Sequence, residues 1–530
     1  MPNHTDKGGA RQGALTVAAM MAATVLSKLL GMLRSVFMAN AYGTTEAANA
    51  FTAAYRIPNS IFDILFSAAI VGCFVPVYSS FDECHADERS EFARVFLNFI
   101  LLFTGTLALL GIIFARQIVA AFTPGLTASA GWLAAALLRV SFPSIVFIGA
   151  AYTLVGVMQS KGRFLLPAAM SLLSNLIIIL YFIFVNGRLG EWGIYGLAVA
   201  YLIAWLAQLL TLAVPLAASG SKYELSLDFK NAAFRRALAM MPSVMAGSWL
   251  LPAGNLVATF FASLTGSSGD VSAFDYAWNI YIIIAGTLVY SLCQYVFPKL
   301  SRRSAEGDSI GFGESVSSGM LALWALILPF VFGAFILARE GVAALLLRGA
   351  FDASDAESVS AALRMLLFAV PAFAANEMLS RVFYSRADPA VAAGAAAAGI
   401  AGNVISCAIM VSIFRFGLGG VALSGAVGQY VSAAVLLAFA AKKIPGLFSR
   451  GFFAELLKGA ACSLISAGVM AATYAFMPGS PYERGLIPNI LVCAAVFLPA
   501  AVLYALMLWI SGYAPLLAFR SARAGEKREK

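Results

Sequence analysis

The stretch from Ser27 to Phe81 decides the fold, and it reads SKLLGMLRSVFMANAYGTTEAANAFTAAYRIPNSIFDILFSAAIVGCFVPVYSSF. It predicts two consecutive membrane helices joined by a short polar turn at Gly43–Asn49. Three cations, Lys28, Arg34 and Arg56, lie inside or at the edges of these helices. Because such a residue at the centre of a bilayer costs roughly 2.5–3.5 kcal/mol to insert, it normally faces protein or a water-filled cavity. We therefore expect a cationic cavity, which favours an anionic cargo; snorkelling to the headgroups is the alternative, above all for Lys28.

The composition is that of a polytopic membrane protein. The chain has 530 residues, of which 61% are hydrophobic and 12% charged, and the mean hydropathy is +0.86; soluble domains are near half apolar and a quarter charged. The net charge of +9 comes from basic residues in short loops between apolar runs. That placement indicates membrane topology and anionic headgroups rather than nucleic acid. The six cysteines contain no CxxC pair and only two histidines occur, so we expect no metal site. No GxxxxGK[ST] loop is present, so we expect no nucleotide-binding site either.

Fourteen apolar runs are long enough to cross roughly 30 Å of hydrocarbon, which takes about 20 residues. We expect the first run to be retained as a helix rather than cleaved as a signal peptide. Most lysines and arginines fall in the N-terminus, the even-numbered loops and the C-terminal tail, so the positive-inside rule predicts that both termini are cytoplasmic. The expected spans are 14–42, 51–80, 92–115, 131–158, 164–187, 192–216, 236–264, 272–298, 313–338, 358–385, 388–414, 418–441, 453–476 and 486–513.

The chain also repeats itself. GIYGLAVA at 193–200 recurs in kind as GLGGVALS at 417–424, and LLRVSFP at 137–143 pairs with ALRMLLF at 362–368. The basic turns near 159–168 and 384–393 match at nearly the same offset. These pairs predict two six-helix lobes in the same orientation, related by an axis along the membrane normal. We expect lobes at 1–216 and 217–445, two further helices at 446–515, and a basic cytoplasmic tail at 516–530.

Two such lobes around a cationic cavity predict a carrier that works by alternating access. An intramembrane enzyme is the competing class, but it needs a cluster of nucleophiles or acid–base pairs. Intramembrane acids are few, and Glu377 lies four residues before Arg381, which predicts an ion pair on one helix face. The spacing of Ser27, Gly31 and Arg34 places them on one face too, with Gly31 leaving room for a bulky headgroup. The candidate substrate-binding residues are Arg34, Arg56, Lys28, Asn49, Asp63 and Asn279.

Several motifs resemble those of one transporter family. LSKLLGMLRS, NAFTAAYRIPN and FVPVYSSF in the opening stretch, TPGL at 123–126, and GRFLLPA with Asn175 are similar to the MurJ (MviN) lipid II flippases, within the MATE-like polysaccharide-exporter superfamily. The resemblance resumes at LLLRGAFDASD (345–355), LSRVFYSRADP (379–389) and GNVIS (402–406). It covers about 440 residues in order.

The resemblance implies a flippase rather than an enzyme, located in the bacterial cytoplasmic membrane. Its cargo would be an undecaprenyl-pyrophosphate-linked peptidoglycan precursor, moved from the inner to the outer leaflet. The two C-terminal helices would form a groove for the lipid tail. The implied partners are the cargo, membrane lipids and the cell-wall synthesis machinery. We expect no cofactor. The energy for transport would then come from the membrane potential or from coupling to a cation.

The candidate cavity departs from the family pattern at three places. Family members commonly have Asp at the position of Asn49, a basic pair at Phe62 and Asp63, and Asp-Arg at Trp278 and Asn279. Because asparagine lacks both the charge and the bidentate fork of arginine, these changes leave other cargoes open. The alternatives are an exporter of another undecaprenyl-linked glycan, a multidrug or ion antiporter of the same superfamily, and an inactive scaffold.

Overall fold

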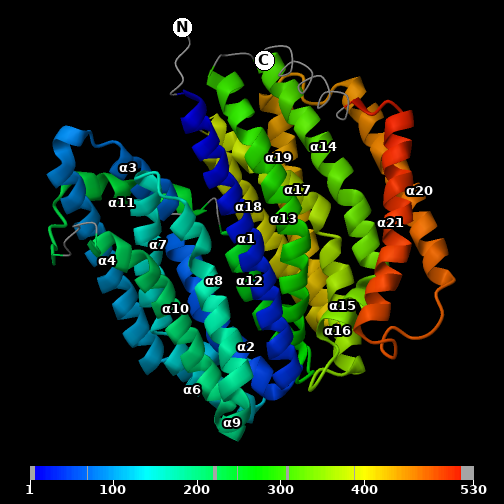
Figure 1. The fold of residues 1–530 in the computed structure, drawn as a ribbon, viewed down its shortest axis with the longest axis horizontal. Helices are drawn as coiled ribbons and strands as arrows, with labels where there is room; N and C mark the ends of the chain where they lie inside the picture. The colour runs from blue at the N-terminus through cyan, green and yellow to red at the C-terminus, as the bar shows by residue number, and fades with distance from the viewer. Residues whose placement is uncertain are drawn as a thin grey trace. The chain divides into compact units, whose positions relative to one another are not determined.

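The structure is a computed structural model and describes residues 6–67, 70–218, 224–246, 249–305, 309–386 and 388–514. Within these ranges the regular structure is helical, apart from one isolated β-bridge between Arg348 and Phe351. The chain forms two compact units, 1–272 and 273–530, which are described separately below (Figure 1). The predicted all-α class is confirmed. The predicted basic tail at 516–530 lies outside the described residues.

Unit 1 is a bundle of long helices connected by short turns. Figure 1 shows α9 at one end of this bundle and both α3 and α11 at the other, and these are called here the α9 end and the α11 end. Short π-helical segments at 63–67, 70–74 and 182–186 interrupt the α-helices. The helices are α1 (Asp6–Tyr42), α2 (Glu46–Phe62), α3 (Val75–Ser79), α4 (Ala86–Ile113), α5 (Ala115–Phe122), α6 (Ala128–Ser141), α7 (Ser144–Ser160), α8 (Leu165–Tyr181), α9 (Gly187–Leu189), α10 (Gly193–Ala218), α11 (Ala232–Ala246), α12 (Leu250–Ser263) and the first turn of α13 (Asp270–Ala305).

Unit 2 holds the rest of α13 and eight further helices. Helices α20 and α21 form an antiparallel pair whose connecting loop lies near α15, as Figure 1 shows. A π-helical segment at 408–413 follows α18. The helices are α14 (Ser309–Ile336), α15 (Ala338–Leu346), α16 (Ala353–Leu367), α17 (Val370–Ser385), α18 (Pro389–Cys407), α19 (Gly417–Lys443), α20 (Arg450–Ala475) and α21 (Leu486–Ile510).

Local signals explain where the helices begin and bend. Thr45 and Thr127 cap α2 and α6 by accepting the backbone N–H groups three residues on, and Asp352 and Asp355 form a capping box at α16, which satisfies N–H groups that a helix start leaves unpaired. Between α6 and α7 the chain bends by 41° at Pro143, which has no N–H to donate. A 45° bend between α16 and α17 likewise precedes a proline.

In the described residues, each predicted span overlaps one helix or several consecutive helices. Of the described residues, nine helical stretches are long and apolar enough to cross a membrane, or eleven if each bent pair counts as one. The count of fourteen agrees with this fold and stays a prediction. The boundaries shift most where α11 and α12 together occupy the expected seventh span.

The predicted internal repeat is visible in the helix order. Helices α4 to α8 and α10 match α14 to α19 in order and similar length, including the short helices α5 and α15. Even the π-helical segments at 182–186 and 408–413 correspond. The repeat therefore extends to irregular backbone. The lobe boundary expected at residue 216 follows this repeat and stays a prediction. The two compact units are divided elsewhere, after residue 272 near the start of α13.

Candidate functional site

The arginine of α1 is held by α8 and α10. The Nη1 of Arg34 donates to Oδ1 of Asn175 on α8 at 3.1 Å. Its Cζ lies 5.5 Å from the centre of the Tyr201 ring on α10. The amide and the aromatic face both orient a guanidinium without neutralising it. Arg34 is half-buried within the helix bundle, as expected for a side chain that faces protein.

A polar seam continues along α1 and α8 beside this arginine. The hydroxyls of Ser27 and Ser171 are 2.5 Å apart, and Nδ2 of Asn175 donates to the Ser27 carbonyl at 3.2 Å. A Cβ on Gly31 would lie 3.6 Å from Nδ2 of Asn175. Gly31 therefore faces the Asn175 amide, and the room expected beside it for a headgroup is taken by α8.

The second arginine is more deeply placed. Arg56 on α2 is 6% exposed, and its Nη1 lies 3.4 Å from the hydroxyl of Thr259 on α12. That hydroxyl donates to the carbonyl of Asn255 one turn earlier. The buried position agrees with a side chain turned toward protein. The contact with Thr259 was not predicted, because the two residues are far apart in the sequence.

Asn49 links α2 to the start of α13. Its Nδ2 donates to the carbonyl of Ser268, and its Oδ1 accepts the N–H of Ser272 at 2.8 Å. Both ends of the amide are therefore bonded to backbone groups. An aspartate, which is common here in the family, accepts but does not donate. Asn49 is a structural link in this state, and its part in cargo binding stays a prediction.

The remaining candidates are spread over both units. Lys28 is half-buried on α1, and Asp63 begins the π-helical segment that follows α2. In unit 2, Nδ2 of Asn279 donates to Oδ2 of Asp275 at 3.0 Å. Unit 1 thus contains five of the six predicted residues, and Asn279 belongs to the other unit.

The ion pair expected within α17 is confirmed. Nη1 of Arg381 lies 2.8 Å from Oε2 of Glu377. The guanidinium also donates to the Glu377 carbonyl at 2.9 Å. Glu377 is therefore part of a charge pair on a single helix.

At the α9 end of unit 1, three connecting segments meet closely. The Gly125 N–H donates to the Ser263 hydroxyl at 3.2 Å, and a Cβ on Gly125 would lie 1.9 Å from the Ser263 carbonyl oxygen. The Glu46 carboxylate accepts the hydroxyls of Thr127 and Ser129 at 3.0 and 2.9 Å. The pocket among these segments measures about 80 Å³, too small for the few hundred Å³ that even a drug-sized ligand needs. The pocket among these segments therefore has no room for a large headgroup.

Unit 2 contains a buried charged network that the sequence did not reveal. Glu340 on α15 is 0% exposed and accepts the Tyr474 hydroxyl at 2.7 Å. Arg484, in the α20–α21 loop, lies 3.7 Å from the same carboxylate oxygen and donates to the carbonyls of Pro478 and Gly479. The loop is thereby fastened to α15. The positive-inside rule did not predict this pair, because it counts only lysine and arginine and takes no account of acidic partners.

Long apolar helices, an internal repeat and cations buried within the bundle define a multi-pass α-helical membrane transporter. The family model of the lipid II flippase MurJ matches residues 38–490. The chain therefore belongs to the lipid II flippase MurJ family, as its motifs indicated, and this membership places it among transporters rather than enzymes.

Individual relatives agree over most of the chain. A lipid II flippase MurJ of Burkholderia cenocepacia is 26% identical over 505 residues, which cover 92% of this chain and 96% of the relative. A probable lipid II flippase MurJ of Bdellovibrio bacteriovorus is 26% identical over 443 residues, covering 82% and 84%.

Solved structures show the same fold. A lipid II flippase MurJ in an inward closed conformation superposes with a TM-score of 0.77 at 21% identity, covering 92% of this chain and 98% of that one. An inward-facing multidrug transporter of the MATE family reaches a TM-score of 0.66 at 16% identity, covering 81% and 98%. The chain therefore shares its fold with a transporter of the MATE family.

Proposed function

We propose that this protein moves lipid II, an undecaprenyl-pyrophosphate-linked peptidoglycan precursor, from the inner to the outer leaflet of the bacterial cytoplasmic membrane by alternating access. Family membership over residues 38–490 is the observation that carries this proposal. The polar seam of α1 and α8 supports it, because an oriented arginine among membrane helices suits a pyrophosphate.

Arg34 is the residue that we propose binds the cargo. A guanidinium donates two parallel hydrogen bonds to a phosphate, and such charge-assisted bonds are about twice as strong as neutral ones. Asn175 engages Nη1, which positions the fork without cancelling its charge. In this proposal Arg56 and Lys28 add positive potential, since a cation need not touch an anion to attract it through a region of low dielectric.

The hydrogen bonds at the α9 end support alternating access. Asn49 and Gly125 come from the first half of the internal repeat, whereas Ser263, Ser268 and Ser272 come from the second half as predicted from sequence. We propose that release of the cargo requires these neutral hydrogen bonds to open. Hydrogen bonds worth about 0.5–1.5 kcal/mol each are weak enough to break and re-form in a transport cycle.

The proposed topology places both termini and the α11 end of unit 1 on the cytoplasmic side, following the distribution of basic residues. The α9 end then faces outward. On this side we also place any contact with the enzymes that use lipid II for cell-wall synthesis.

The energy for the cycle is proposed to come from the membrane potential or from a cation, since the sequence has no phosphate-binding GxxxxGK[ST] loop. Dissipating the membrane potential and the cation gradients one at a time, in cells that depend on this protein, should identify which of them stops lipid II from reaching the outer leaflet. Unchanged transport after both treatments would contradict the coupling.

Rescue of growth tests the function directly. Cells depleted of a known lipid II flippase should grow when this protein is expressed, and lipid II should reach the outer leaflet. A correctly inserted, expressed protein that fails to rescue would reject the proposal and favour export of another undecaprenyl-linked glycan, the reading motivated by Trp278 and Asn279.

A further inference from the structure

The turn between α7 and α8 gathers positive charge at the α11 end of unit 1. Lys161 and Arg163 are exposed in this turn, and Arg89 lies in the first turn of α4. Helices α3 and α4 both pack against α7, so the first turn of α4 and the α7–α8 turn lie at the same end of unit 1. Partial desolvation lowers the pKa of Lys161, and the positive charges of Arg89 and Arg163 lower that pKa further, as this arrangement implies. The three cations are called here the basic cluster.

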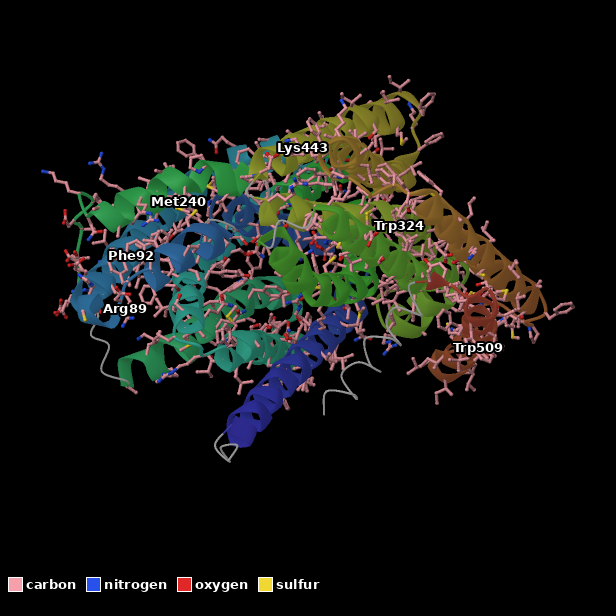
Figure 2. All side chains as sticks on the ribbon, turned by 90° about the horizontal axis from the view of Figure 1, so that it is seen from above. Arg89, Phe92, Met240, Trp324, Lys443 and Trp509 are labelled. Atoms are coloured by element: carbon pink, nitrogen blue, oxygen red, sulfur yellow. The ribbon has the colours of Figure 1, made fainter. Side chains whose placement is uncertain are left out.

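Arg89 is held in place by an aromatic ring. Its Cζ lies 5.6 Å from the centre of the Tyr78 ring at the end of α3. Its Nε is buried and has no hydrogen-bond partner in the described part of the chain. Figure 2 shows Arg89 close to Phe92, at the same end of α4. A guanidinium fixed against a ring in this way still presents its positive charge to a nearby anion. The acids of the same turn, Asp87 and Glu88, are exposed.

The turn of unit 2 that corresponds to the α7–α8 turn contains an acidic residue that neutralises its positive charge. The Arg163 N–H donates to the Met158 carbonyl at 2.9 Å, and at an offset of 225 the Asp388 N–H donates to the Phe383 carbonyl at 3.0 Å. The two turns therefore share one backbone pattern. Asp388 takes the place of Arg163 and forms an ion pair with Lys443, so this turn carries its own counter-charge.

The basic cluster borders an apolar surface. Phe164 and Leu165 follow Arg163 directly and are 41% and 45% exposed at the start of the membrane helix α8. An anion bound here would have apolar groups beside it on the membrane side. That arrangement fits a lipid, with its phosphate at the cations and its chains along α8, better than a free ion.

We infer that the basic cluster of Arg89, Lys161 and Arg163 is a binding site for the phosphate of an anionic lipid headgroup. The site is separate from the seam of Arg34 and Asn175, and its occupant is a resident lipid rather than the transported cargo. Binding at this end would hold the α7–α8 turn and the start of α4 together through one shared anion. Each cation near an anionic headgroup contributes about fivefold in affinity, which corresponds to ~1 kcal/mol.

The test uses the full-length protein in detergent, with native mass spectrometry to count bound phosphatidylglycerol and phosphatidylcholine. Wild type should bind phosphatidylglycerol more tightly. Lys161→Gln with Arg163→Gln should weaken the first binding step roughly 25-fold, since two cations are lost. Arg163→Asp should weaken the first binding step by a similar factor, because it removes one positive charge and adds one negative charge. The turn should tolerate this change, since the corresponding turn has an aspartate at 388.

The matched control removes two charges from the corresponding end of the repeat, through Arg386→Gln and Lys442→Gln, and should leave binding within about twofold of wild type. Equal binding by wild type and the cluster variants, or an equal loss in the control, would overturn the site. Excess inorganic phosphate should fail to displace phosphatidylglycerol; full displacement would show that a free anion is the occupant and would reject the lipid. Binding is measured without transport, so these outcomes are independent of the rescue experiment.

Discussion

Arg34 illustrates how a single charge depends on its neighbours. An arginine in a membrane helix is costly to insert, and here the Asn175 amide and the Tyr201 ring receive it without cancelling its charge. These two contacts reduce the cost of burial, and neither of them carries a negative charge. This combination is the one that a pyrophosphate-binding residue needs.

Substitution of Arg34 tests this role. Arg34→Ala should abolish transport in the rescue assay with normal expression and insertion, because losing a charge-assisted hydrogen bond costs on the order of 1.5–3 kcal/mol, a roughly ten- to hundredfold loss in affinity. Arg34→Lys should keep part of the activity, since a point charge replaces the fork. Near-normal transport by a stably inserted Arg34→Ala protein would remove Arg34 from the binding site.

Two glycines in neighbouring segments should respond oppositely to alanine. Gly125→Ala places a Cβ 1.9 Å from a backbone oxygen, so the α9 end must shift, and we expect a loss of about 1–3 kcal/mol in stability. Gly131→Ala, in α6, meets nothing within 4 Å and should gain about 0.5–1 kcal/mol. Thermal unfolding of the purified proteins measures both. A Gly125→Ala protein as stable as Gly131→Ala would contradict the close packing of TPGL on α12.

At the scale of elements, the α20–α21 pair is fastened at its loop as well as along its helices, which pack on α14 and α15. Large apolar side chains along α21, such as Leu498 and Val502, are about 60% exposed, as expected for a lipid-facing helix. The loop places Arg484 near the fully buried Glu340. The position of this helix pair therefore depends on a few polar contacts in addition to the packing of Met470 and Val496 against Leu337.

A double-mutant cycle measures that dependence. Glu340→Gln and Arg484→Met should each lower the thermal stability of the detergent-purified protein, by about 3–5 kcal/mol, because each leaves one buried charge without its counter-charge. The double variant should lose much less than the sum, since both charges are then gone. Additive losses would mean that the two side chains do not interact.

At the scale of the whole molecule, the topology can be read from cysteine accessibility. All six native cysteines are free, and among them Cys84 is exposed, in the loop before α4. With both termini cytoplasmic, an impermeant thiol reagent should label Cys84 only after the cells are permeabilised. In a Cys84→Ser background, Ser267→Cys at the α9 end should be labelled in intact cells.

The structure decides where these reporters are placed. Gly269 lies in the expected outward loop, but it is buried, and a Cβ there would lie 2.5 Å from the Thr44 carbonyl oxygen. Ser267 is exposed in the same loop and replaces it. Labelling of Cys84 in intact cells at the level of Ser267→Cys would overturn the proposed orientation.

The sequence by itself determined the membrane class, the order of the spans, the repeat and the family. Hydropathy runs, basic turns and local motifs carry that information, because the bilayer acts on each segment separately. The Glu377–Arg381 pair was equally predictable, since four residues on a helix always share a face. Side-chain partners across helices are different in kind. Asn175 meets Arg34, Ser263 meets Gly125 and Arg484 meets Glu340 from 141, 138 and 144 residues away. Only the tertiary structure decided these contacts, because they depend on which helix faces pack together, and no local pattern specifies that.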